Sequence, residues 1–159
     1  EPHLVIFVDS GFSIEDLSTQ IFLSFPRKNI GNQEAEKRAS SSSAFVDFIG
    51  NYFAREFSDL FPVGININFV RKVENSKILE YRCFERGINH ETLACGTGAL
   101  AVAFVAKNLK MVDSPKVVVW PHRCRWEIPD AEMKVEKCDR GWLLNGNPRM
   151  LLQGQFMRN

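Results

Sequence analysis

The sequence lacks any apolar run near the roughly 20 residues that a helix needs to cross a bilayer. Its first 20 residues also lack the basic start and apolar core of a secretory signal peptide. Charge is balanced, because 20 Lys and Arg residues stand against 19 Asp and Glu residues, and no basic stripe is present. These absences argue against membrane and nucleic-acid partners and predict a cytoplasmic protein that acts on a small molecule.

Cysteine is scarce and irregularly spaced. The chain has four, Cys83, Cys95, Cys124 and Cys138, and they form neither a disulfide framework nor a C-x-x-C metal knuckle. His122 lies close to Cys124 in the sequence, but two such ligands without a second pair are weak grounds for a metal site. We therefore predict reduced thiols and no bound metal.

The 159 residues, 45% of them hydrophobic, suit one domain with a real core. Apolar residues recur at spacings of three and four over 44–57, which predicts an amphipathic helix. The segment 3–9 is nearly all apolar, which predicts a strand covered on both faces. In 61–73 apolar and polar residues alternate, which predicts a strand with one polar face. Further strands are expected at 77–86, 116–120, 124–128, 133–138, 141–146 and 149–156, the last four as a meander.

Residues 99–106 contain no charged or polar side chain, so the helix predicted to end near Leu109 is apolar all round. A helix of that kind is buried. Many strands and few helices then predict an α+β fold, in which a curved, mixed and mostly antiparallel β-sheet of barrel-like shape wraps around this central helix.

A thiol lies where this helix begins, in the sequence "ACGTGALA". Gly96 and Gly98 leave the first backbone N–H groups bare, and those groups together with the helix dipole favour an anion. The same field favours a thiolate at Cys95, which makes it a candidate base for chemistry on a carboxylate-bearing substrate. The alternative is a small buried hydrophobic residue without a chemical role.

Four motifs in order, "PHLVIFV", "FPVGININFV", "FERG" and "ETLACGTGALA", resemble the second half of diaminopimelate epimerase. The resemblance covers most of the chain. It implies one of two similar domains, each a curved sheet around a central helix with a catalytic cysteine at its head. It also implies a reaction without pyridoxal phosphate, metal or other cofactor: one cysteine, as thiolate, removes the α-proton, and the other returns a proton to the opposite face.

The resemblance assigns roles to residues near the helix start. Cys95 resembles the catalytic thiol of the second domain, and Gly96 and Thr97 resemble the backbone donors to the substrate carboxylate. Glu85 and Arg86 resemble substrate binders: the guanidinium suits a carboxylate, and the carboxylate suits an ammonium or the thiol's proton.

Three further positions follow from the other motifs. Asn66 resembles a hydrogen-bonding contact to the substrate, with Asn68 as the substitute if the alignment shifts. His3 resembles a histidine near the thiol of the other domain. Glu1 stands where the family has Asn, which puts a substrate contact there in doubt.

Other departures leave the substrate open. Residues 20–48 resemble an insertion atypical of the family. Three cysteines, Cys83, Cys124 and Cys138, match no catalytic position, so we predict structural roles for these three. The alternatives to a diaminopimelate epimerase of lysine and peptidoglycan biosynthesis are an isomerase or racemase acting on another amino or carboxylic acid, and a non-catalytic module that binds carboxylates or a protein.

Only one half of a two-cysteine site is present in residues 1–159, which we read as a single domain resembling the carboxy-terminal half of the enzyme. We expect this chain to be inactive alone. The missing thiol is expected from a longer chain, which the start without Met favours, or from a second chain, for which a homodimer is one arrangement.

Overall fold

The computed structural model of the protein describes residues 1–8, 42–124, 128 and 130–148. Within these residues, more are in β-strands than in helices. A mixed sheet has the order β1 (His3–Phe7), β2 (Asn66–Lys72), β3 (Ile78–Glu85), β5 (Lys116–Pro121), β6 (Met133–Cys138) and β7 (Gly141–Asn145). The short strand β4 (His90–Thr92) pairs with the end of β3. The pairs β1–β2 and β3–β5 are parallel, and the others are antiparallel.

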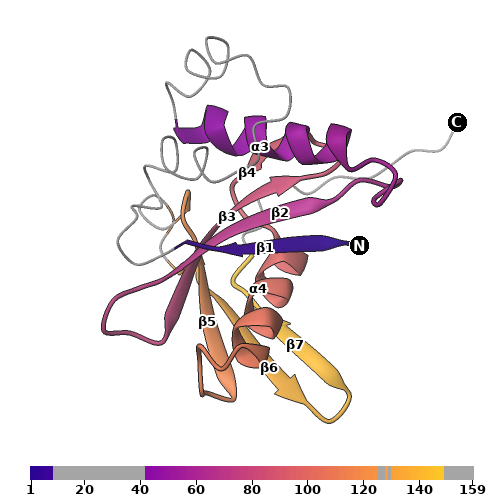
Figure 1. Ribbon diagram of the computed structural model, residues 1–159. Helices are drawn as coiled ribbons and strands as arrows, with labels where there is room; N and C mark the ends of the chain where they lie inside the picture. The colour runs from indigo at the N-terminus through magenta and orange to yellow at the C-terminus, as the bar shows by residue number, and fades with distance from the viewer. Residues whose placement is uncertain (9–41, 125–127, 129, 149–159) are drawn as a thin grey trace, which may run out of the picture.

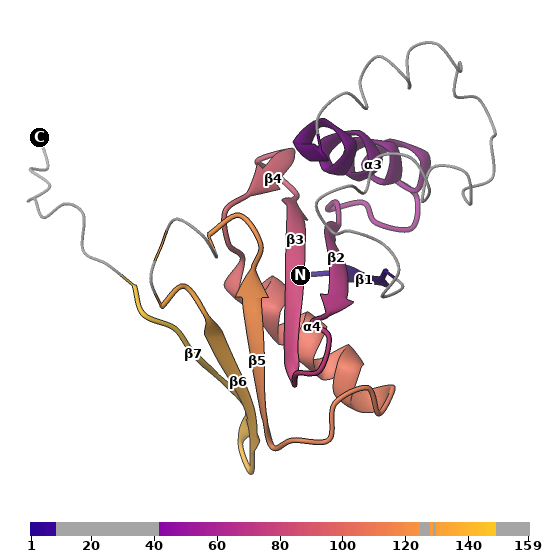
Figure 2. The ribbon, with the colours of Figure 1, turned by 90° about the vertical axis from the view of Figure 1, so that its left-hand side faces the viewer.

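The two helices of the described residues lie on opposite faces of this sheet (Figure 1). Helix α3 (Ser42–Glu56) packs on β3 and β4, while α4 (Gly96–Asn108) contacts all six strands of the main order. Figure 2 shows the sheet curling around α4. The fold is therefore α+β, with a curved mixed sheet around a central helix, as the sequence predicts.

Successive side chains of β2 and β3 point to opposite faces of the sheet, and a hydrophobic core forms on each of these faces. Tyr81 and Cys83 pack with α4, whereas Phe69 and Phe84 pack with α3. The asparagine face of β2 is also buried: Asn68 is 0% exposed. The polar face predicted for this strand thus lines the interior around α4 rather than meeting solvent.

Most of the predicted elements are confirmed. Helix α3 matches the amphipathic segment 44–57, and β1, β2, β3, β5, β6 and β7 lie where strands are predicted. Of the predicted meander, β6 and β7 form an antiparallel pair, and β6 also pairs with β5, which the prediction leaves outside the meander. The segments 149–156, most of 20–48 and most of 124–128 lie outside the described residues.

Two predictions about burial are wrong. Strand β1 is half-buried, because it ends the strand order within the described residues and pairs only with β2. Helix α4 is not covered all round, since Phe104 is 49% exposed and packs edge-on against Trp142. The sheet covers one side of the helix, and the apolar residues on its other side stay partly open.

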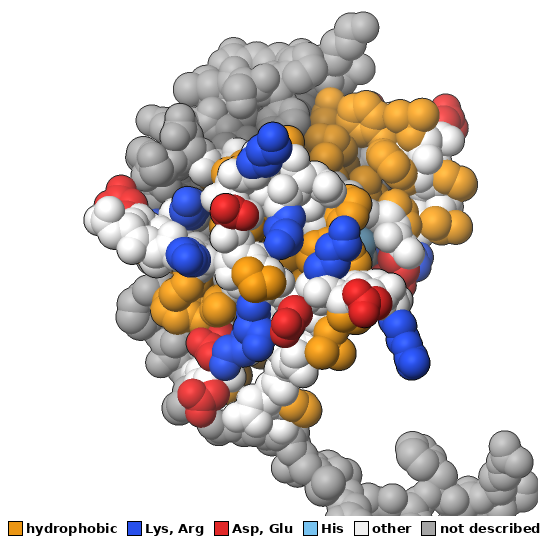
Figure 3. Space-filling model, turned by 90° about the horizontal axis from the view of Figure 1, so that it is seen from below, with side chains coloured by type: hydrophobic (Ala, Val, Ile, Leu, Met, Phe, Trp, Pro, Cys, Tyr) orange, Lys and Arg blue, Asp and Glu red, His pale blue; other side chains and the backbone are white. Residues whose placement is uncertain are grey.

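The lower face of the molecule carries Lys and Arg side chains interspersed with Asp and Glu, with apolar side chains between them (Figure 3). No charge of one sign gathers there, in keeping with the net charge of +1. Neither described helix is long and apolar enough to span a membrane.

Candidate active site

Cys95 is the N-cap of α4, with an extended backbone at φ −130° and ψ 113°. Its Sγ accepts a hydrogen bond from the Gly98 N–H at 3.3 Å and lies 3.4 Å from Thr97 Oγ1. The sulfur therefore takes the place that a Ser or Asp oxygen usually has at a helix start. The first bond of the helix ladder runs from the Ala99 N–H to the Cys95 carbonyl, at 2.9 Å.

Tyr81 fixes the backbone of this cap from the middle of β3. Its hydroxyl donates to the Cys95 carbonyl and accepts from the Cys95 N–H, both at 2.8 Å. Burial raises the pKa of Tyr81, so its hydroxyl stays protonated and keeps both roles. The position of the thiol is thus set by a tertiary contact as well as by the helix.

Two more groups of β3 approach the thiol. The sulfurs of Cys83 and Cys95 and a carboxylate oxygen of Glu85 all lie within 4.8 Å of one another. Thr92 on β4 holds the Glu85 carboxylate through a hydrogen bond of 2.5 Å from its hydroxyl. Because side chains of a strand alternate, Tyr81, Cys83 and Glu85 share the face that looks toward α4.

These neighbours favour the ionised form of Cys95. Hydrogen bonding from the Cys83 thiol, and then from Thr97 and the Gly98 amide, lowers the pKa of Cys95 from 9.0 to about 7, although burial opposes the shift. Hydrogen bonding to Cys95, together with burial, raises the pKa of Cys83. Cys95 is therefore the thiolate of the pair near neutral pH, and Cys83 keeps its proton.

His3 and two asparagines form a polar cluster beside this thiol pair. The His3 ring nitrogens lie 3.4 Å from Asn66 Nδ2 and 3.2 Å from Asn68 Nδ2. Burial lowers the pKa of His3, which favours the neutral imidazole. Asn66 also accepts from the Arg86 backbone N–H at 2.9 Å, so the start of β2 is tied to the end of β3.

Asn68 points its oxygen at the start of α4. A Cβ added to Gly98 would lie 2.5 Å from Asn68 Oδ1 and 3.3 Å from Cys95 Sγ, so only glycine leaves room for this approach. Asn68 Oδ1 is buried and has no hydrogen-bond partner. The cluster therefore contains an acceptor whose capacity the described residues leave unused.

Arg86 contacts Glu1 and Val63 through its guanidinium. Its Nη2 pairs with the Glu1 carboxylate at 2.9 Å and its Nη1 donates to the Val63 carbonyl at 2.8 Å. The Arg86 guanidinium also holds the pKa of Glu1 below its usual value. Of the predicted site residues, the structure brings Cys95, Glu85 and Thr97 together, places His3 and Asn66 next to them, and ties Arg86 to Glu1.

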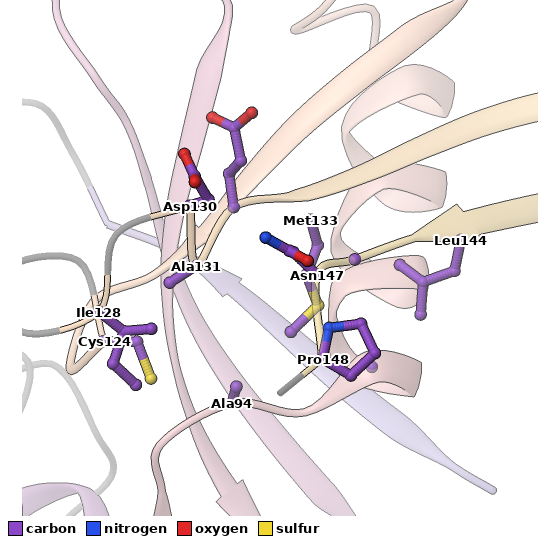
Figure 4. A pocket seen from close by; sticks show the side chains of 12 residues that line it. Ala94, Cys124, Ile128, Asp130, Ala131, Met133, Leu144, Asn147 and Pro148 are labelled. Carbon is purple, nitrogen blue, oxygen red and sulfur yellow. The ribbon is translucent and has the colours of Figure 1, made fainter. Parts of the chain in front are cut away.

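A mostly apolar cavity of about 470 Å³ adjoins the same turn (Figure 4). Ala94 and Gly96 line it from the turn, and Cys124, Met133, Leu144 and Pro148 complete much of its wall. Cys95 is not among the lining residues, because its thiol faces Cys83 and Glu85. His122 and Cys124 contact different partners: His122 lies 3.1 Å from a Glu80 oxygen, and the Cys124 thiol donates to the Leu93 carbonyl at 3.2 Å.

Sequence reasoning missed Tyr81 and Cys83. The structural role predicted for Cys83 is incomplete, because this residue is packed in the core and also contacts the thiol of Cys95. The alternation of β3 could have shown that Tyr81, Cys83 and Glu85 share a face, but the local pattern does not reveal which helix that face meets. Cys138 is exposed and has no place in the core.

Comparison with known proteins gave no match to a family model. Diaminopimelate epimerase from Clostridium perfringens is 34% identical over 99 residues, 62% of this chain and 33% of that protein. The enzymes from Methanothrix thermoacetophila and Archaeoglobus fulgidus are 53% and 46% identical over 55 and 63 residues, which cover 35% and 40% of this chain and 19% and 22% of those proteins. This chain carries a diaminopimelate epimerase-like domain.

The matched regions span 19% to 33% of the length of these curated relatives. Among solved structures, a phenazine biosynthesis protein of the PhzF family from Bacillus anthracis matches 72% of the chain and 30% of its own, with 12% identity and a TM-score of 0.37. That likeness is too distant to carry a functional argument.

Proposed function

We propose that the diaminopimelate epimerase-like domain supplies one of two catalytic thiols to a cofactor-independent amino-acid epimerase. The observation that carries the proposal is the position of Cys95 at the N-cap of the central helix, where the Gly98 amide donates to its sulfur. Hydrogen bonding there lowers the pKa of Cys95 to about 7. Relatives named diaminopimelate epimerase support diaminopimelate, or a closely similar amino acid, as the substrate. The reaction then belongs to lysine and peptidoglycan biosynthesis, in the cytoplasm.

In this mechanism Cys95 Sγ takes the α-proton of the substrate. The α C–H bond breaks, an S–H bond forms, and the electron pair moves toward the substrate carboxylate. Gly98 N–H already bonds the sulfur and Ala99 N–H begins the helix ladder, so among the contacts of the described residues the amides of Gly96 and Thr97 remain to receive the carboxylate. Glu85, beside the sulfur, is placed to bind an ammonium group or to guide the thiol proton.

Inversion needs a second thiol on the opposite face of the α-carbon. A reacting atom sits about 3–3.5 Å from its partner, so two such sulfurs are about 6–7 Å apart. Cys83 lies within 4.8 Å of Cys95 on the same side, too close to serve as the second sulfur. We infer that another domain or a second chain provides it, and that this domain alone does not invert the substrate.

Exchange of the α-hydrogen tests the proposal. The full-length protein is incubated in D₂O with diaminopimelate, and deuterium incorporation is followed by NMR for wild type and Cys95→Ala. We expect the variant to exchange at least about 100-fold more slowly, which is the usual size of general-base catalysis. Cys138→Ala, at an exposed thiol, is the matched control and should exchange at the wild-type rate. Undiminished exchange in Cys95→Ala would refute the role of this thiol.

A related isomerase or racemase with another amino or carboxylic acid substrate is favoured by one contact. Arg86 pairs with Glu1, which stands at the position where the resemblance leads us to expect Asn, so the surroundings of this guanidinium differ from those that the resemblance implies. A panel of amino acids followed by chiral chromatography separates the two enzymes. Inversion of diaminopimelate in preference to all others would exclude the alternative.

A further inference from the structure

Two sulfurs and a carboxylate converge beneath the start of α4. Cys83 and Glu85 extend from one face of β3, Cys95 comes from the helix cap, and the three ligand atoms lie within 4.8 Å of one another. No other group of three His, Cys, Asp or Glu side chains within the described ranges meets this criterion. The cluster joins two soft ligands to one hard ligand, a set typical of zinc-like ions rather than of Mg²⁺ or Ca²⁺.

An independent feature points to the same spot. Asn68 is paired with Cys83 across β2 and β3, and its buried Oδ1 has no hydrogen-bond partner. This oxygen and Cys95 Sγ lie 2.5 and 3.3 Å from the same point, the place of an absent Gly98 Cβ. A buried acceptor without a donor is costly, and a cation or the proton of a ligand would relieve that cost.

We infer that Cys83, Cys95 and Glu85 form a site for one thiophilic divalent cation of the zinc class, with Asn68 Oδ1 placed to complete it. Zn–S bonds are about 2.3 Å long, so two sulfurs of a tetrahedral site lie about 3.8 Å apart. The sulfurs of Cys83 and Cys95 are at most 4.8 Å apart, so they must approach each other by about 1 Å or less to bind one ion. Binding forms two metal–sulfur bonds and releases the proton of Cys83, together with that of Cys95 where this thiol is still protonated, with no change of oxidation state.

Groups around the ligands already orient them. The Thr92 hydroxyl holds the Glu85 carboxylate, and the Gly98 amide donates to the Cys95 sulfur. Outer contacts of this kind fix ligand geometry in metal sites. An ion bound here occupies the thiol that we propose as the base, so it would act as an inhibitor. The ligand set itself does not depend on that function.

Titration with CdCl₂ alone tests the site, because each cadmium–thiolate bond adds ultraviolet charge-transfer absorbance. The reduced, metal-free full-length protein carries Cys138→Ser in every sample, which removes the exposed thiol outside the cluster. We expect one Cd²⁺ to bind with two thiolates, and ZnCl₂ to displace it. Cys83→Val should halve the absorbance and weaken binding at least about 100-fold, since loss of an outer contact alone costs 10–100-fold.

Two outcomes would overturn the inference: no charge-transfer band in the parent protein, or the same band and affinity in Cys83→Val. Circular dichroism checks that the variant is folded, and Cys83→Ser replaces it if it is not. Alkylation gives a second readout, because saturating Cd²⁺ should protect Cys95 from iodoacetamide. Labelling of Cys95 at an unchanged rate would refute the site. None of these measurements uses substrate, so their failure is distinct from failure of the proposed function.

Discussion

At the residue scale, the thiol of Cys95 depends on side chains that are distant in the sequence. Cys83 and Tyr81 reach it from β3, one at the sulfur and the other at the backbone. The helix start alone provides the Gly98 amide and the Thr97 hydroxyl. The ionisation of Cys95 is thus a joint property of α4 and β3, and a substitution on the strand should change it.

The pH dependence of alkylation measures this effect. We expect the rate of Cys95 labelling by iodoacetamide, with a chelator present, to rise with a midpoint near pH 7, since only the thiolate reacts. Cys83→Val removes a donor to the thiolate and should move the midpoint upward by about one unit. The non-catalytic alternative is favoured if the parent midpoint lies near the free thiol value of about 8.5.

Gly98 is the second residue on which the site depends. In Gly98→Ala the new Cβ would meet Asn68 Oδ1 at 2.5 Å, so β2 and α4 must move apart. We expect the free energy of unfolding in urea to fall by about 1–3 kcal/mol. Gly146→Ala is the control, because a Cβ there has no atom within 4 Å. Equal stability of the two variants would show that Asn68 can turn away without cost.

At the scale of elements, α3 is fitted to the sheet at one close approach. A Cβ on Gly50 would lie 2.1 Å from the ring of Phe84, which is fully buried on β3. The helix backbone therefore rests directly on the aromatic ring. Phe45 and Ile49, one turn apart on the same side, fill the rest of this contact with the sheet.

Gly50→Ala should thus destabilise the protein even though alanine favours helices. Overpacking costs about 1–3 kcal/mol or more, which outweighs the helix propensity gain of about 1 kcal/mol. Asn51→Ala, on the exposed side of the same helix, should change the unfolding free energy by less than about 1 kcal/mol. Thermal or urea unfolding distinguishes them, and a more stable Gly50→Ala would contradict the close contact.

Elements whose patterns are local could be predicted from the sequence. The spacing of apolar residues by three and four over 44–57, and the alternation of apolar and polar residues over 61–73, depend only on nearby residues. Helix α3 and strand β2 could therefore be predicted from the sequence. Cys95 was identified because a glycine turn and a helix start are also local. The role of Cys83 could not be predicted from the sequence, because it depends on β3 crossing the start of α4. The burial of Asn68 was hidden for the same reason.

At the scale of the whole molecule, four segments meet at Glu91. Its carboxylate forms a two-pronged ion pair with Arg82 on β3, and its backbone N–H donates to Asp47 on α3 at 2.5 Å. Arg123, after β5, donates to its carbonyl at 3.4 Å. Glu91 lies four residues before Cys95, so this junction holds the segment that leads into the helix cap.

The Arg82–Glu91 pair should therefore matter far more than a surface pair. Its side chains are 3% and 1% exposed, so Arg82→Met leaves a buried carboxylate without its main partner and should cost about 3–5 kcal/mol of unfolding free energy. The double variant Arg82→Met, Glu91→Leu should recover much of that loss, because no charge is left buried.

Lys116→Met is the control, because it breaks an exposed pair. The Lys116 and Glu136 side chains are 50% and 38% exposed, so this variant should cost less than about 1 kcal/mol. Urea unfolding of the variants gives these differences directly. If Arg82→Met proves as mild as Lys116→Met, water reaches Glu91, and the segment before Cys95 is held by the backbone contacts of β4 instead.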